Sequence, residues 1–183
     1  ARRAAVIGHP VGHSLSPVLH RAAYRELGLP HTYDAIDVPE GGAREMLASL
    51  DAGWLGLSVT MPHKQAVLPL LDRVSPLAAR IGAVNTIVRG EDGTLTGHNT
   101  DAPGFLEPLR PLLAERHLLR MARVLGTGGA ARAIVAALAD EGFVLVLAGR
   151  DPAKARALLD ELAPAAGGLD HHAVALRHFA DET

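Results

Sequence analysis

The apolar positions in the first hundred residues follow two different periods. Short apolar runs that end at glycine, proline or other turn residues predict β-strands, at residues 4–8, 32–38, 54–60, 84–88 and 94–97. Apolar residues spaced three and four positions apart predict helices between these strands, at residues 17–27, 43–50, 63–71 and 76–81. We expect Ser16 to be the N-cap of the first helix, with Pro17 in its first position. The alternation of strands and helices predicts an α/β fold.

The pattern changes near residue 123, where strands and helices begin to alternate regularly. Strands are predicted at residues 123–126, 144–148 and 172–176, with helices at 129–141 and 152–162. This β-α-β-α-β order predicts a parallel sheet with right-handed connections. The preceding residues 103–115 should form a broken helix, because Pro108 and Pro111 lack backbone donors. We therefore predict two domains, at residues 1–101 and 122–183, joined by a connecting helix or linker at 102–121.

The composition narrows the class of protein. The 183 residues carry a formal net charge of −2, so the chain lacks the basic excess expected of a nucleic-acid-binding protein. It contains no cysteine, which excludes disulfides and thiol catalysis. No apolar run is long enough to span a bilayer, and no apolar signal-peptide region follows the basic N-terminal residues. We therefore expect a cytoplasmic protein with neither a membrane nor a nucleic acid as its partner.

A glycine-rich turn at residues 126–131 matches the G-x-G-x-x-A spacing of a dinucleotide-binding motif. The first glycine permits a tight turn, the second lets a pyrophosphate approach the backbone, and Ala131 keeps the helix close to the strand. Alternatively, the glycines only end a strand and begin a helix. The predicted strand and helix on either side favour a partial Rossmann domain. The expected cofactor-binding residues here are Gly126, Thr127, Gly128, Gly129, Ala130 and Ala131.

Two charged residues follow the next predicted strand and bear on the choice of cofactor. An enzyme that uses NAD usually places an acidic residue at this strand tip, where it binds the ribose hydroxyls. Here Ala148 and Gly149 are followed by Arg150, which could pair with the 2′-phosphate of NADP. Asp151 could itself accept a ribose hydroxyl, or it could simply cap the next helix. We favour NADP, with Arg150 and Asp151 in the cofactor site and NAD as the alternative.

A lysine and an aspartate stand at the ends of two predicted strands, Lys64 after residues 58–63 and Asp101 after residues 97–100. Facing each other in a cleft, such a pair could transfer a proton to or from a substrate oxygen. Proton transfer beside a dinucleotide indicates a carbonyl/alcohol oxidoreductase. The alternatives are a surface lysine and a helix-capping aspartate.

Several small polar side chains could bind a polar substrate. Ser14 and Ser16 could donate to a carboxylate, although Ser16 could also cap a helix. The pairs Asn85–Thr86 and Asn99–Thr100 suit the hydroxyls of a polyol, although asparagine is also common in turns. The ten histidines show no His-x-x-x-His arrangement with a carboxylate, so we expect no metal.

Taken together, five segments resemble the shikimate dehydrogenase family. They are residues 8–20 (GHPVGHSLSPVLH), 58–64 (SVTMPHK), 82–86 (GAVNT), 97–101 (GHNTD) and 126–132 (GTGGAAR). The resemblance extends over nearly the whole chain and keeps the family's order. It implies a three-layer α/β substrate domain followed by the partial Rossmann domain.

The resemblance also implies an activity and a set of site residues. The reaction is the reversible reduction of 3-dehydroshikimate to shikimate with NADPH, a step of the shikimate pathway to chorismate and the aromatic amino acids. Lys64 and Asp101 are implied to be the catalytic pair, both also in contact with substrate. Ser14 and Ser16 are implied to hold the substrate carboxylate, and Thr60, Asn85 and Asp101 its hydroxyls.

The sequence also departs from the family. Ser58 stands where the family often has asparagine, and Thr127 replaces a usual alanine. Residues 148–151 replace the common Asn-Arg-Thr/Ser cofactor segment, which leaves an NAD-dependent quinate/shikimate dehydrogenase open. Family members also continue beyond the equivalent of residue 183. We therefore expect a fragment or a natural truncation with weak or no turnover, which keeps a non-catalytic shikimate-binding protein as a third reading. A homodimer is also left open.

Overall fold

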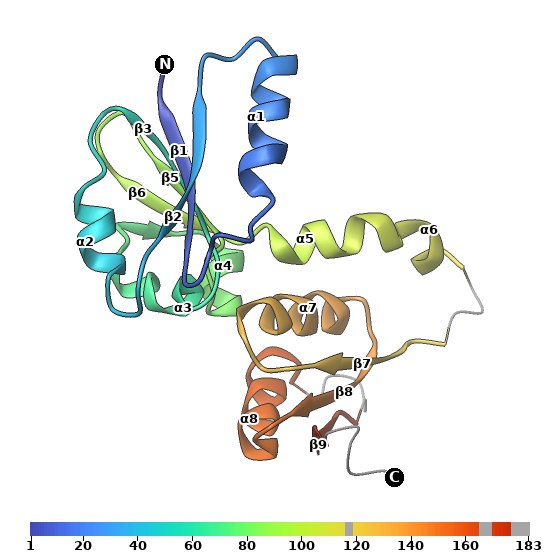
Figure 1. Ribbon diagram of the computed structural model, residues 1–183. Coiled ribbons are helices and arrows are strands. Elements are labelled where there is room, and N and C mark those ends of the chain that lie inside the picture. Colours follow the sequence, from blue (N-terminus) through green and yellow to red (C-terminus); the bar gives the residue numbers. More distant parts are fainter. Residues whose placement is uncertain (116–118, 165–169, 177–183) are drawn as a thin grey trace. The chain divides into compact units, whose positions relative to one another are not determined.

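The computed structural model describes residues 1–115, 119–164 and 170–176, drawn in colour in Figure 1. The chain divides into two compact units, Ala1–Asn99 and Thr100–Thr183. Strands and helices alternate in both units, so the predicted α/β class is confirmed.

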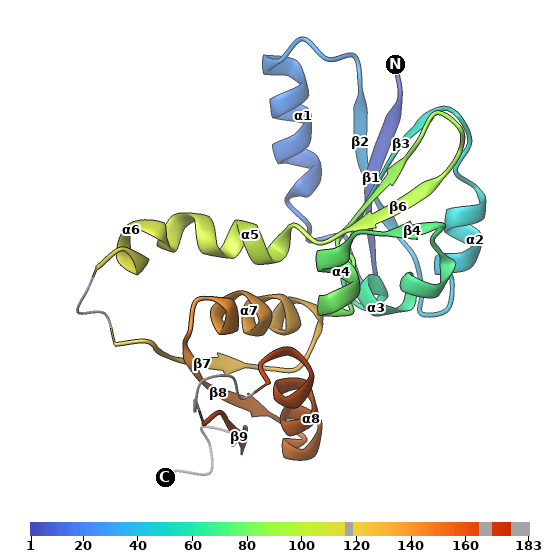
Figure 2. The ribbon, with the colours of Figure 1, turned by 180° about the vertical axis from the view of Figure 1, so that it is seen from behind.

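The first unit contains a six-stranded mixed sheet with the order β2-β1-β3-β5-β6-β4. Its strands are β1 (Arg3–Gly8), β2 (Thr32–Asp37), β3 (Trp54–Val59), β4 (Arg73–Val74), β5 (Thr86–Arg89) and β6 (Leu95–His98). Strands β1, β2 and β3 are parallel to one another, and β5 runs antiparallel to both β3 and β6. The two-residue strand β4, which the sequence did not predict, lies beside β6 (Figure 2).

Helices cover both faces of this sheet. They are α1 (Ser16–Glu26), α2 (Ala43–Ala48), α3 (His63–Ala66), the 3₁₀ turn η1 (Leu68–Leu70) and α4 (Pro76–Ile81). Alternate residues of β1 point to opposite faces, as expected of a strand. Ala5 and Ile7 join the core cluster that contains residues of α2 and α4. Ala4 and Val6 join a second cluster, against which Tyr24 of α1 packs. The predicted three-layer arrangement is thus confirmed for this unit.

The start of α1 differs from the prediction. The helix begins at Ser16 itself, and the residue in the N-cap position is Leu15, which makes no capping hydrogen bond through its side chain. Instead, the Ser14 hydroxyl accepts a hydrogen bond of 3.3 Å from the Ser16 N–H. Ser16 is therefore the first helical residue and not the N-cap. Ser14 supplies the acceptor for one of the free backbone donors of the first turn.

The second unit is a three-stranded parallel sheet with the order β7-β8-β9. Its elements are α5 (Asp101–Leu106), the 3₁₀ turn η2 (Glu107–Leu109), α6 (Arg110–Leu113), β7 (Met121–Leu125), α7 (Gly129–Asp140), β8 (Val144–Gly149), α8 (Pro152–Leu162) and β9 (His172–Ala175). The helical segment before β7 is broken into three short pieces at Pro108 and Pro111, as predicted. Leu145 and Leu147 of β8 and Leu159 of α8 are completely buried in its core.

Neither a membrane-spanning helix nor a metal-binding cluster is found among the residues that the structure describes. In this part of the chain, no helix combines the length and apolar character needed to cross a bilayer. Within the same residues, no three histidine, aspartate or glutamate side chains come together as a metal site would require.

Candidate active site

The sheet of the first unit brings four chain segments to one edge. Parallel pairing places the last residues of β1, β2 and β3 at this edge, with Gly8 opposite Asp37 and Ile7 opposite Val59. Because β5 is antiparallel to β3 and β6, its first residue, Thr86, lies at the same edge and pairs with both Ser58 and His98. The loops after β1, β3 and β6 and the turn before β5 therefore meet here.

The loop after β1, called the serine loop below, carries Ser14 and leads to Ser16, the first residue of α1. Asp37 at the end of β2 holds this loop in place. One oxygen of Asp37 accepts the Val11 N–H at 3.2 Å, and the other lies 2.8 Å from Nδ1 of His9. The Val11 carbonyl in turn accepts the Ser14 N–H at 2.9 Å. The hydrogen bond from His9, followed by that from Val11, holds the pKa of Asp37 below its usual range. A carboxylate that is ionised at neutral pH thus anchors the serine loop.

Thr60 and Lys64 lie at the turn between β3 and α3. The Thr60 N–H donates to the Ile7 carbonyl at 2.9 Å, and the His9 N–H donates to the Met61 carbonyl at 3.0 Å. These bonds join the Lys64 segment to the serine loop. His63 next to Lys64 is fully buried, with its Nε2 2.7 Å from the Val38 carbonyl. Lys64 itself is half-buried on this anchored turn.

Asn85 lies directly beside the Lys64 turn. The Val84 N–H donates to the Lys64 carbonyl and the Val59 N–H to the Asn85 carbonyl, both at 2.7 Å. The Asn85 side-chain oxygen accepts the Thr86 hydroxyl at 3.0 Å. Asn99, at the end of β6, is buried and donates through Nδ2 to the Ala83 carbonyl at 2.9 Å, so its amide serves the fold.

The structure thus brings together five of the six predicted substrate-binding residues at one edge of the first unit: Ser14, Ser16, Thr60, Lys64 and Asn85. The sixth, Asp101, is the first residue of α5 in the second unit and follows Asn99 by two positions. Two further residues lie at this edge but were not predicted as site residues, namely Ser58 and Asp37. Strand order and pairing place them there.

In the second unit, the glycine-rich turn connects β7 to the 12-residue helix α7. Gly126 has a φ of +94°, a conformation that favours glycine, and its N–H donates to the Ala148 carbonyl at 2.7 Å. A Cβ atom at Gly126 or Gly128 would meet no other atom within 4 Å. The turn therefore leaves open space at the N-terminus of α7, where backbone N–H groups and the helix dipole favour an anion. The residues present here fit the pyrophosphate of a dinucleotide.

Arg150 and Asp151 follow the end of β8, as predicted. Asp151 is the N-cap of α8, and its Oδ1 accepts the N–H groups of Ala153 at 2.9 Å and Lys154 at 3.2 Å. Arg150 is exposed. The capping role anticipated as an alternative for Asp151 is therefore what the structure shows, while the arginine side chain lies open to solvent beside the β8 tip.

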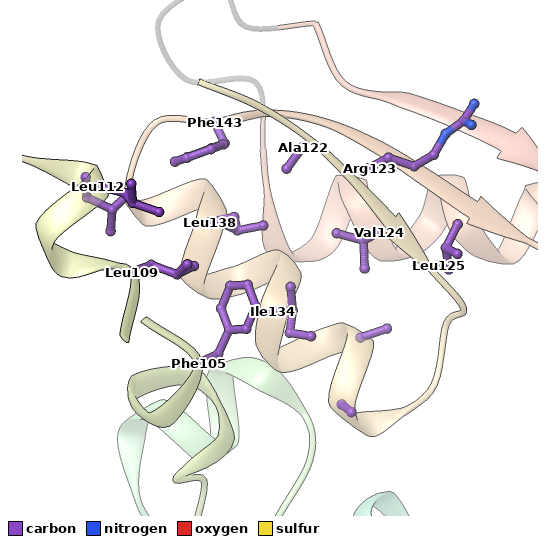
Figure 3. Close-up of a pocket in the computed structure, with 13 residues that line it drawn as sticks. Phe105, Leu109, Leu112, Ala122, Arg123, Val124, Leu125, Ile134, Leu138 and Phe143 are labelled. Carbon is purple, nitrogen blue, oxygen red and sulfur yellow. The ribbon is translucent and has the colours of Figure 1, made fainter. Parts of the chain in front are cut away.

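An apolar cavity of about 470 Å³ lies within the second unit, between α5–α6, β7 and α7 (Figure 3). Its lining includes Phe105, Leu109, Ile134 and Phe143, and its one charged residue is Arg123. Such a lining offers few hydrogen-bonding partners, so this cavity does not suit a small anionic polyol.

The chain is similar in sequence to known shikimate dehydrogenases. Residues 6–87 match the family described as the shikimate dehydrogenase substrate binding domain. The chain is 51% identical over 163 residues to the shikimate dehydrogenase (NADP(+)) of Moorella thermoacetica, covering 88% of this chain and 55% of that protein. The chain thus spans little more than half of this relative's length.

Solved structures show the same likeness. Shikimate 5-dehydrogenase from Thermus thermophilus, in complex with shikimate, is 41% identical with a TM-score of 0.81, covering 97% of this chain and 64% of that one. Quinate dehydrogenase from Corynebacterium glutamicum, in complex with NAD, is 35% identical with a TM-score of 0.79, covering 96% and 64%. The family match, the sequence identity and the shared fold together show that this chain belongs to the shikimate dehydrogenase family.

Proposed function

We propose that this chain contains the substrate site and catalytic pair of an NADP-dependent shikimate dehydrogenase, which interconverts 3-dehydroshikimate and shikimate. The observation that best supports this is the convergence of Ser14, Ser16, Thr60, Lys64 and Asn85 at one sheet edge. Hydroxyl, amide and ammonium donors are the groups that a small anionic polyol requires. The relatives named above bear this activity in their names.

In this proposal Lys64 and Asp101 carry out the proton transfer. The Lys64 ammonium donates to the carbonyl oxygen of 3-dehydroshikimate and stabilises the negative charge that develops there. Asp101 holds the neighbouring substrate hydroxyl and assists the transfer. When bound, a nicotinamide cofactor would supply the hydride that reduces the carbonyl carbon. In the reverse direction Lys64 accepts the hydroxyl proton of shikimate.

The cofactor is proposed to be NADP, held by the turn from Gly126 to Ala131 and by Arg150. Oδ1 of Asp151 accepts two backbone N–H groups of α8, so this oxygen is used in capping. The exposed guanidinium of Arg150 remains suited to a 2′-phosphate. A second candidate is an NAD-dependent quinate/shikimate dehydrogenase, which the likeness to a quinate dehydrogenase in complex with NAD supports.

The test is to follow reduced-nicotinamide absorbance with shikimate or quinate and with NADP or NAD. Turnover of shikimate with NADP should fall by about 10²- to 10⁴-fold in Lys64→Ala. The matched control is Gln65→Ala, an exposed neighbour on α3 that should keep its rate. Turnover that requires NAD and quinate would favour the second candidate. Shikimate binding without any turnover would favour a non-catalytic binding protein, and wild-type rates in Lys64→Ala would refute the proposed chemistry.

A further inference from the structure

The phenol of Tyr33 on β2 extends across the sheet toward the edge where the predicted substrate-binding residues lie. Its side chain is only 2% exposed, and its hydroxyl donates to Oγ of Ser58 on β3 at 2.7 Å. Strand β1 lies between these two strands, and its residue Ala4 pairs in register with Tyr33 on one side and Gly56 on the other. Because both intervening residues are small, the phenol has room to reach Ser58.

The helix α1 packs on the Tyr33 ring through His20. The His20 ring stacks on the Tyr33 ring, with centroids 3.9 Å apart and planes 11° from parallel. Nδ1 of His20 lies 2.9 Å from the Ser16 carbonyl, so the same histidine is tied to the first turn of α1. Three elements, α1, β2 and β3, therefore meet at the Tyr33 side chain, α1 through the ring and β3 through the hydroxyl.

The direction of the protons in this cluster decides what it can bind. Burial raises the pKa of Tyr33 above its ordinary value, so the phenol remains a donor throughout the physiological range. Ser58 accepts from this phenol, and Ser14 accepts from the Ser16 N–H. Since each serine oxygen already accepts an internal bond, its own O–H proton can be donated outward. A set of outward donors matches a carboxylate, which only accepts.

We propose that Tyr33 is a positioning residue of the substrate site, whose phenol holds Ser58 so that the Ser58 hydroxyl donates to the substrate carboxylate alongside Ser14 and Ser16. This rests on the proposed function, which supplies shikimate as the ligand. Tyr33 itself does not touch the substrate. Its effect on binding therefore passes through Ser58.

The experiment is calorimetric titration of the 183-residue chain and its variants with shikimate and with shikimate methyl ester, which lacks the anionic carboxylate. Tyr33→Phe removes only the hydroxyl and keeps the ring stacked on His20. It should weaken shikimate binding by about tenfold, which corresponds to one lost hydrogen bond. The same change should alter ester binding by less than about threefold. Ser58→Ala should show the same preference, and the double variant should be no weaker than Ser58→Ala alone.

Tyr24→Phe is the matched control, because Tyr24 also contacts the His20 ring, edge-on at 6.2 Å between centroids, and it should bind both ligands normally. Thermal melting of each variant detects loss of fold. Should Tyr33→Phe prove unstable, the selective effect of Ser58→Ala on shikimate decides the question. Normal shikimate affinity in Tyr33→Phe, or equal losses for acid and ester, would overturn the inference alone. Failure of the folded wild-type chain to bind shikimate would overturn the proposed function as well.

Discussion

Two glycines in the first unit and two in the second have opposite surroundings. In the first unit, a Cβ atom at Gly56 would lie 2.0 Å from the Ile87 carbonyl oxygen, and one at Gly8 would lie 2.4 Å from Cγ2 of Thr60. In the second unit, a Cβ atom at Gly126 or Gly128 would meet nothing within 4 Å. Gly128 moreover has an ordinary extended backbone, with φ −80° and ψ −178°.

This difference shows that a glycine can be required at a position for two distinct reasons. Gly56 and Gly8 are needed because neighbouring strands and loops leave no room for a side chain. At Gly128 neither the backbone conformation nor the packing of the chain demands glycine, so its lack of a side chain keeps space for something else. That space lies at the N-terminus of α7, where a pyrophosphate is expected. Four changes, in order of expected effect, test and sharpen this contrast between the units.

The largest effect should come from Gly56→Ala in the first unit. The new methyl group would press on the Ile87 backbone, and Gly56 has a φ of +154°, which other residues rarely adopt. Overpacking and backbone strain together should lower the free energy of unfolding by about 3 kcal/mol or more. Urea denaturation measures this loss. Gly12→Ala, which faces open space, is the control and should unfold like the wild type.

Gly128→Ala should separate stability from cofactor binding. Its backbone conformation is open to alanine, so the free energy of unfolding should change by less than about 1 kcal/mol. The added methyl group should nevertheless occupy space intended for the pyrophosphate and weaken NADP binding by about tenfold, or ~1.4 kcal/mol. Calorimetric titration with NADP checks this. Unchanged affinity would mean that the open space at Gly128 has no part in cofactor binding.

The second unit should also lose stability in mild acid, because it contains His171, a buried histidine whose pKa the fold lowers. Burial, followed by the nearby charge of Arg156, lowers the pKa of His171 from its ordinary value of 6.5. The unfolded chain therefore binds a proton more readily than the folded one, and stability falls as the pH drops below about 6.5.

Thermal melting between about pH 8 and pH 5 should reveal this loss in the wild type. His171→Asn keeps an acceptor for the Leu145 N–H, which now donates to Nδ1 at 3.1 Å, but cannot titrate in this range. The variant should therefore show a flatter dependence on pH. An equally steep dependence in the variant would show that another group is responsible.

Asp37 should give the smallest effect and a different pH window, because it lies in the first unit and is exposed. Its pKa is lowered by the hydrogen bond from His9, so its contribution to stability is complete above its ordinary pKa of 3.8. That contribution is lost only as the pH falls through the lower folded value. Asp37→Asn should loosen the serine loop and weaken shikimate binding a few-fold at neutral pH, measured by titration. Unchanged binding would show that the loop holds its shape without the carboxylate.

Most elements of both units could be predicted from the sequence, because apolar periodicity and turn residues are local signals. Errors arose where tertiary bonds decided the outcome. Val84 and Asn85 were assigned to a strand, but their N–H groups donate to the Lys64 and His98 carbonyls, so β5 begins only at Thr86. The strand β4 has two residues, too few to show a period.

The candidate site was predictable to the extent that it follows chain order. Serine, threonine, lysine and asparagine residues stand just after or before strands, and strand ends meet at a sheet edge. The role of Tyr33 was not predictable, because its contact with Ser58 depends on β1 lying between β2 and β3 and on the small residues Ala4 and Gly56. The burial of His63 likewise depends on the Val38 carbonyl, 25 positions earlier in the chain.

The central claim is that shikimate binds to the first unit and NADP to the second. It can be tested most directly by nuclear magnetic resonance of the isotope-labelled chain, titrated with shikimate and then with NADP. Our account predicts that shikimate shifts the amide signals of Ser14, Ser16, Thr60, Lys64 and Asn85 in the first unit. NADP should shift those of residues 126–131 and Arg150 in the second. Shikimate shifts confined to the second unit, or NADP shifts that spare the glycine turn, would contradict the account.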